Sequence, residues 1–102
     1  MTQQTSYIEA LAENRRLAIL KLLTECGGGG NDSTIHQSLE LLGFRRDPRS
    51  VIREDLNFLS RNGLVRETWH NDLMIVDITQ RGEEAVEGRI VVAGIKKPSL
   101  GV

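Results

Sequence analysis

The chain is poor in the residues on which several classes of protein depend. It contains one cysteine, Cys26, and two histidines, so it can form no internal disulfide bond, and a structural zinc site would need ligands from outside the chain. Only 4% of its residues are aromatic, so leucine, isoleucine and valine must fill the core. Its 102 residues leave room for one domain with one core.

Long hydrophobic runs are also missing. No stretch approaches the roughly 20 apolar residues that span a bilayer, and Met1–Gln4 has neither the basic start nor the apolar segment of a signal peptide. We therefore expect a cytoplasmic protein without a membrane partner.

An excess of positive charge is a third absence, since the formal net charge is −1. Neutralisation of phosphates by Lys and Arg supplies most non-specific affinity for DNA, so any DNA binding must come from charge that is gathered locally. Such a cluster exists, because Arg45, Arg46, Arg49 and Arg53 fall within nine residues and are opposed there only by Asp47.

The first predicted helix begins at Ser6, which forms the pattern of a capping box with Glu9. Apolar residues at steps of three and four continue it to about Glu25. Arg15 and Arg16 lie in the middle of this helix, and we expect them to point outward.

Four glycines, Gly27–Gly30, are predicted to end this helix and to form a connector. They lack the Lys-Ser/Thr pair that a phosphate-binding loop requires. Asn31 or Asp32 then caps a short second helix that ends at Gly43. The spacing of Ile35, Leu39 and Leu42 predicts its buried row.

A third helix is predicted over residues 47–62. Asp47 can cap it, Pro48 suits its first position, and Gly63 ends it. Its buried row is predicted from Ile52, Leu56 and Leu59, with support from Val51 and Phe58.

Two strands, Leu64–His70 and Leu73–Ile78, flank Asn71-Asp72, a pair that suits a two-residue hairpin turn. This turn predicts a register with opposite charges on one face and apolar pairs on the other. The predicted pairs are Arg66 with Asp77, Trp69 with Met74, and Val65 with Ile78. Thr79 is predicted to cap a last short helix that runs to about Gly88 and buries Ala85 and Val86.

This order predicts an α+β winged helix-turn-helix, with a three-helix core, a two-stranded hairpin wing and a short carboxy-terminal helix. We expect residues 1–88 to form the domain and residues 89–102 to form a tail with an extended or mobile end. The tail residues Ile90, Val91, Val92 and Ile95 either extend a homodimer surface with the first helix or pack on their own domain. We expect the homodimer.

Helix 47–62 is the expected recognition helix in the major groove of double-stranded DNA. With its apolar row facing the core, one polar face steps by three and four along Arg49, Ser50, Arg53, Asn57 and Ser60. Arginine and asparagine can form paired hydrogen bonds with base edges. Arg45 and Arg46, just before the helix, are placed to meet phosphates. The predicted DNA-binding residues are therefore Arg45, Arg46, Arg49, Ser50, Arg53 and Asn57.

The same residues permit a second interpretation, an adaptor that binds protein and not DNA. An arginine-rich helix face is often only a solvated surface, and Glu54 and Asp55 would repel phosphate unless they turn aside. Asp55 could pair with Arg16 or Arg66. The hairpin tip carries no Lys or Arg that could enter a minor groove.

Residues 49–65 resemble the recognition helix and first wing strand of bacterial winged-helix repressors. The segment is similar to the Arg-x-Asp-Leu-Asn core of DeoR-type regulators and to the leucine pair before Gly-Leu-Val in ArsR-type ones. Ile78–Gly82 is similar to the Leu-Thr-x-x-Gly that closes many wings. The whole chain, including Gly94–Ser99, also resembles small proteins of Mu-like prophages labelled as ArsR-like regulators. The resemblance implies a phage or prophage transcriptional regulator.

Departures from these families narrow the expected function. Residues 45–63 contain no cysteine or histidine, so the metal site of ArsR-type sensors is not expected, and the chain has no room for the sugar-phosphate domain of DeoR-type regulators. No cofactor, metal or small-molecule effector is therefore expected. His36 and His70 have no identifiable catalytic partner and are expected to be surface residues, so we do not expect an enzyme.

Overall fold

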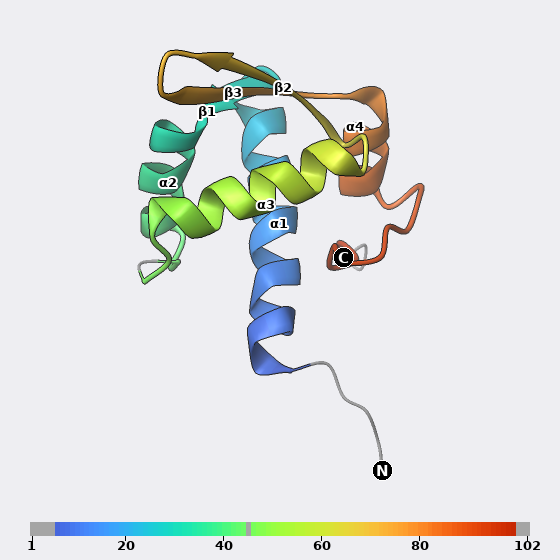
Figure 1. Cartoon of the computed structure of the whole chain (residues 1–102). Coiled ribbons are helices and arrows are strands. Elements are labelled where there is room, and N and C mark those ends of the chain that lie inside the picture. Colours follow the sequence, from blue (N-terminus) through green and yellow to red (C-terminus); the bar gives the residue numbers. More distant parts are fainter. Residues whose placement is uncertain (1–5, 45, 100–102) are drawn as a thin grey trace.

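The described part of the chain forms four helices and a three-stranded antiparallel sheet (Figure 1). The structure, a computed structural model, describes residues 6–44 and 46–99. In chain order, the elements are α1 Tyr7–Glu25, β1 Gly29–Asn31, α2 Asp32–Leu41, α3 Arg49–Arg61, β2 Val65–His70, β3 Leu73–Ile78 and α4 Gln80–Glu87. Within the described ranges, none of the helices has the length and apolar character to cross a bilayer.

The hairpin formed by β2 and β3 has the register that the alternation of charge predicted. Arg66 lies opposite Asp77, and Trp69 lies opposite Met74. Asn71 supplies the positive φ of the turn, at 56°. The apolar residues of the hairpin therefore face the helices, and Met74 and Val76 are fully buried there.

The third strand of the sheet, β1, corrects the prediction that the four glycines form a connector. Its residues pair antiparallel with β3, and Gly29 lies opposite Asp77. A Cβ at Gly29 would come within 2.6 Å of the Asp77 carboxylate, whereas one at Gly30 would lie at ordinary van der Waals distance from Leu23 and Ile35. Two of the four glycines are therefore part of the sheet, and Gly29 leaves room for the carboxylate of Asp77 beside it.

The core lies between α1, α2, α3 and the inner face of the sheet. Its fully buried side chains are almost all leucine, isoleucine and valine, as the shortage of aromatic residues predicted. The buried row of α3, Ile52, Leu56 and Leu59, is confirmed. In α2 only Ile35 and Leu39 of the predicted apolar row are buried. The helix ends at Leu41, so Leu42 lies outside the row and is exposed.

The start of α3 also differs from the predicted one. Pro48 is the residue before the first turn, no side chain caps that turn, and the helix begins at Arg49 rather than at residue 47. The Asp47 carboxylate, predicted as the cap, instead lies 3.4 Å from Arg15 of α1. The prediction was wrong because the strongest partner of this carboxylate is a distant guanidinium.

The segment that follows α4 packs against the domain. Val92 and Ile95 are buried in the core, which corrects the expectation that they extend a dimer surface, whereas Val91 is exposed. Gly94, with φ of +90°, lies so close to Phe58 of α3 that a Cβ would come within 2.4 Å of the ring. The Lys96 amide donates to the Glu13 carbonyl of α1. This segment therefore packs against α3 and is hydrogen-bonded to α1.

Candidate nucleic-acid interface

Helix α3 lies across the front of the molecule, with one side open to solvent along its length (Figure 1). At about 100° per residue, the side opposite its buried row is formed by four residues. This outer ridge consists of Ser50, Glu54, Asn57 and Arg61. All four are exposed except Asn57, which is half-buried. The outer ridge is the part of α3 that a groove of DNA could receive.

Arg49 and Arg53 lie on one flank of α3, where a fully buried carboxylate binds them. Asp32, the first residue of α2, is 0% exposed. The Nε and Nη2 atoms of Arg49 lie 3.1 and 3.3 Å from its oxygens, and Arg53 donates to it through Nε. The amide of Met74 in β3 also donates to Asp32, at 3.3 Å. One side chain thus joins α2, α3 and the sheet.

The protonation of Asp32 follows from these contacts. Burial by itself would raise the pKa of its carboxyl group, but hydrogen bonds from Arg49, Arg53 and the Met74 amide outweigh burial and hold the pKa below its usual range. The carboxylate is therefore ionised at neutral pH, and the two guanidiniums share a single negative charge.

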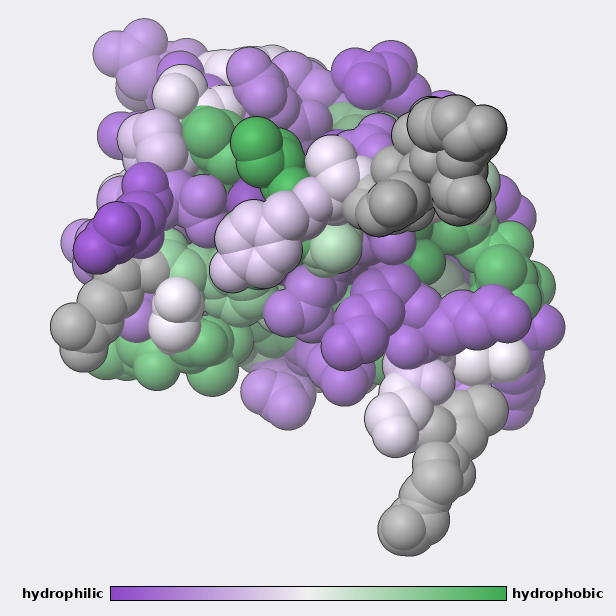
Figure 2. All heavy atoms as spheres, turned by 90° about the horizontal axis from the view of Figure 1, so that it is seen from below, coloured by the Kyte–Doolittle hydropathy of each residue, from purple (hydrophilic) through white to green (hydrophobic). Residues whose placement is uncertain are grey.

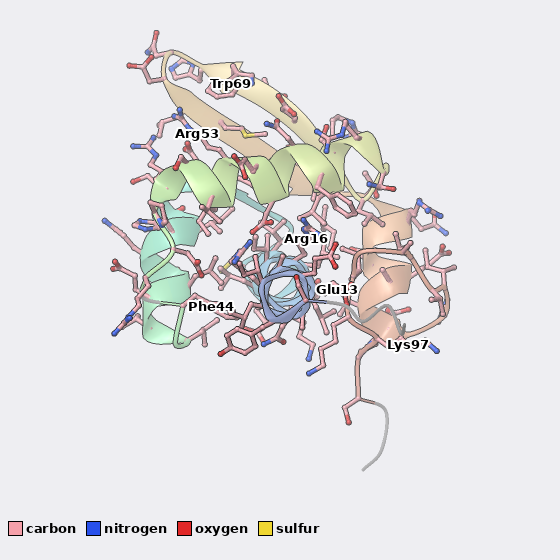
Figure 3. The ribbon with its side chains drawn as sticks, turned by 60° about the horizontal axis from the view of Figure 1, so that its bottom comes forward. Glu13, Arg16, Phe44, Arg53, Trp69 and Lys97 are labelled. Atoms are coloured by element: carbon pink, nitrogen blue, oxygen red, sulfur yellow. The ribbon has the colours of Figure 1, made fainter. Side chains whose placement is uncertain are left out.

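Arg53 also reaches the hairpin. Its Nη2 donates to the carbonyl oxygen of Asp72 at the hairpin turn, and its Cζ lies 5.2 Å from the centre of the Trp69 ring. Figure 3 shows Arg53 extending from α3 toward Trp69. Arg53 is thus bound on three sides, which leaves it less free to read a base than the sequence suggested.

The other flank of α3 is anchored to α1 by a second buried carboxylate. Asp55 is 1% exposed and accepts hydrogen bonds from Arg15 and from Arg16, whose Nε lies 3.1 Å away. Arg15 is 7% exposed, so the prediction that both arginines point outward was wrong, whereas the pairing of Asp55 with Arg16 is confirmed. Burial alone would lower the pKa of Arg15, but its bonds to Asp55 outweigh burial and raise it.

Arg16 continues this network to the carboxy-terminal segment. Its Nη1 donates to the Gly94 carbonyl at 3.0 Å, and its Cζ lies 4.1 Å from the centre of the Phe58 ring.

His36 of α2 fixes the turn before α3, because its Nε2 lies 2.9 Å from the Asp47 carbonyl oxygen. His36 is half-buried, so it is not the plain surface residue that we expected.

The predicted DNA-binding residues therefore separate into three groups. Arg46 and Ser50 are exposed, and Asn57 lies half-buried on the outer ridge. Arg49 and Arg53 are held on the flank by Asp32. Arg45 lies outside the described residues.

Sequence reasoning missed Arg61, the exposed cation at the far end of the outer ridge. Its position eleven residues after Ser50, three turns along a helix, could have identified it.

The arrangement concentrates positive charge on one face. Among the described residues, Arg46, Arg49, Arg53 and Arg61 lie on or beside the outer side of α3, and the same segment holds three carboxylates, Asp47, Glu54 and Asp55. Two of those carboxylates, on Asp47 and Asp55, point inward to arginines of α1. Only Glu54 remains exposed among the three. This face can attract phosphates, and the uncapped first turn of α3 adds backbone amides that can bind an anion.

Comparison with known proteins places the chain among proteins of phages and bacteria. It is 34% identical over 90 residues to gp26 of Escherichia phage Mu, an alignment that covers 88% of this chain and 93% of that protein. The chain belongs to the gp26 family. An uncharacterized protein of Haemophilus influenzae is 34% identical over 77 residues, 74% of either chain. Likeness to a Mu phage protein is thus confirmed, and the ArsR-type label stays a prediction.

The fold of this gp26-family chain is also found in a solved structure. A MepR-like protein, crystallised in complex with pseudoligands, matches 78% of this chain with a TM-score of 0.58 and 21% identity. The match covers 55% of that protein, so this chain spans about half its length. The likeness confirms the winged-helix fold. No protein-family model matches the chain.

Proposed function

We propose that this protein is a non-catalytic, DNA-binding transcriptional regulator that inserts α3 into the major groove of double-stranded DNA. The outer ridge of α3 faces the bases, and Arg46 and the first turn of the helix meet phosphates. Arg49 and Arg53 hold the helix in position and present their remaining N–H groups at the edge of the contact. The cytoplasm is the expected location.

One observation carries this proposal, the inward orientation of Asp47 and Asp55. Both carboxylates belong to the segment that would face DNA, and both would repel phosphate if they were exposed. Arg15 pairs with both from the interior, so Glu54 is the one exposed carboxylate that the described part of this segment sets beside the exposed Arg46 and Arg61. The local charge on the outer side of α3 therefore favours DNA binding, although the formal net charge of the whole chain is −1.

Reversing the charge of Arg46 and Arg61 together is expected to weaken binding of duplex DNA at least about tenfold at physiological salt, because each contact with a phosphate releases bound counterions. The probe is a duplex selected from genomic fragments that the protein retains at low ionic strength. Its affinity is measured by fluorescence anisotropy over a range of salt concentrations. The slope of log affinity against log salt should fall by about two in the double variant R46E/R61E.

The matched control is R89E/K97E, which makes the same change in charge at exposed positions away from α3, where Figure 3 places Lys97. It should bind within about twofold of the parent, because surface charges more than about 8 Å from the contact are largely screened. Equal losses in both double variants would mean that DNA does not bind at α3. A parent protein that retains no DNA at low ionic strength would favour the adaptor.

We further propose that the protein acts as a homodimer through the exposed end of α1. Tyr7 and Ile8 are both 77% exposed on the first turn, which projects beyond the rest of the domain in Figure 1. Figure 2 shows this end of the molecule, with hydrophobic side chains among hydrophilic ones. I8E is expected to halve the molar mass measured by sedimentation equilibrium. A parent protein that sediments as a monomer at all concentrations would contradict the proposal.

A further inference from the structure

We propose that Trp69 and Arg53 form a platform that packs against the deoxyribose backbone of duplex DNA, beside the groove that receives α3. This inference rests on the proposed function and adds the hairpin as a second contact. The sequence alone did not predict a DNA contact by the hairpin, because the hairpin tip has no Lys or Arg. The structure instead shows an arginine of α3 extended to the hairpin.

The platform lies on the same side of the sheet as α3. Trp69 is paired with Met74, and the two side chains of such a pair lie on one face of a sheet. Met74 is fully buried, whereas Trp69, in the last residues of β2 before the hairpin turn, is 48% exposed. The next residue, His70, points to the opposite face. Trp69 is therefore the large apolar side chain that β2 presents next to the recognition helix.

Contacts from two elements fix the indole ring. Its Nε1 donates to the Glu67 carboxylate at 2.8 Å, and the Arg53 guanidinium lies over its ring. Arg53 is itself held by the buried Asp32 and by the Asp72 carbonyl. An aromatic ring that is ordered before binding loses little conformational entropy when it makes a contact. Both side chains of the platform are therefore already held in position before DNA binds.

The chemistry of the platform suits a sugar–phosphate backbone. The exposed part of the indole offers an apolar surface to the C–H groups of deoxyribose, and the neighbouring guanidinium offers donors to the adjoining phosphate. Glu67 lies beside the ring and disfavours a phosphate there. Together these groups orient a strand with its sugar over Trp69 and its phosphate toward Arg53.

Trp69 is the sole tryptophan of the chain, so intrinsic fluorescence reports directly on this contact. Titration with the selected duplex should change the intensity or wavelength of its emission, and added salt should reverse the change. In anisotropy measurements with dye-labelled duplex, W69A should bind about tenfold more weakly than the parent, because it removes the apolar surface that is buried against deoxyribose. W69F, which keeps a ring, should recover part of the loss.

H70A is the matched control, because this exposed side chain follows Trp69 on the opposite face of the same strand, and it should bind as the parent does. Thermal unfolding of each variant shows whether the fold is retained. Duplex binding by the parent with unchanged emission and a parent-like W69A would overturn the platform and leave α3 as the reader. Failure of the parent to bind any duplex would overturn both proposals. Tighter binding of a single strand would also overturn the platform, because the ring would then stack on bases.

Discussion

Replacement of Asp55 by alanine is expected to lower the free energy of unfolding by about 3–5 kcal/mol, the range found when one partner of a buried ion pair is removed. The variant leaves Arg15, which is 7% exposed, with only the more distant Asp47 as a partner. Arg16 would keep its bond to Gly94 but lose its carboxylate. Two guanidiniums would then be partly buried without adequate compensation. Urea unfolding at neutral pH, followed by circular dichroism, measures the loss.

Glu54 provides a control from the adjacent position of the same helix. It is exposed and belongs to the outer ridge, so E54A should change the free energy of unfolding by less than about 0.5 kcal/mol. The same variant removes the acidic group nearest the proposed DNA contact and should strengthen duplex binding. If D55A were as stable as E54A, the network between α1 and α3 would contribute nothing to the fold.

The second large effect is expected from removing Arg49 and Arg53 together. The double variant R49A/R53A leaves the fully buried Asp32 carboxylate with only the Met74 amide as a partner. We expect a loss of about 3 kcal/mol, at the low end of the range for a broken buried pair, because both guanidiniums are partly exposed and water can replace them. Urea unfolding measures this loss as well.

The substitution D32N, added to R49A/R53A, distinguishes the effect of an unpaired buried charge on stability from that of a general loss of packing. Asparagine keeps an oxygen for the Met74 amide and removes the charge, so D32N/R49A/R53A should recover most of the stability lost by R49A/R53A. If the triple variant is no more stable than the double variant, the buried charge is not the cause. Any loss of DNA binding by R49A/R53A must be compared with that of the triple variant, because the double variant alone also loosens α3.

Local signals predicted the parts of this fold that depend on neighbours in sequence. The Asn71-Asp72 turn and the alternation of apolar and charged residues were sufficient for the register of the hairpin. The steps of three and four in α3 were sufficient for its buried row. Thr79 and Gly88 delimit α4 as predicted, since a cap and a positive φ act within a few residues.

The partners of the arginines could not be predicted in the same way. Arg53 binds a carboxylate 21 residues away, and Arg15 binds one 40 residues away, so neither pairing follows from a local period. A count of arginines on one helix face predicted a surface for bases. The structure uses two of those arginines to bind a buried acid, and it pairs two of the four glycines with β3 as part of the sheet. Both results depend on which segments meet in three dimensions.

The two buried carboxylates hold α3 from opposite flanks, Asp32 through Arg49 and Arg53, and Asp55 through Arg15 and Arg16. A helix held in this way cannot roll about its own axis, and none of these six side chains belongs to the outer ridge. Mutation can therefore alter Ser50, Glu54, Asn57 and Arg61 without changing how the helix is presented. Under the proposed function, preference for a DNA sequence and stability of the scaffold can thus evolve separately in this domain.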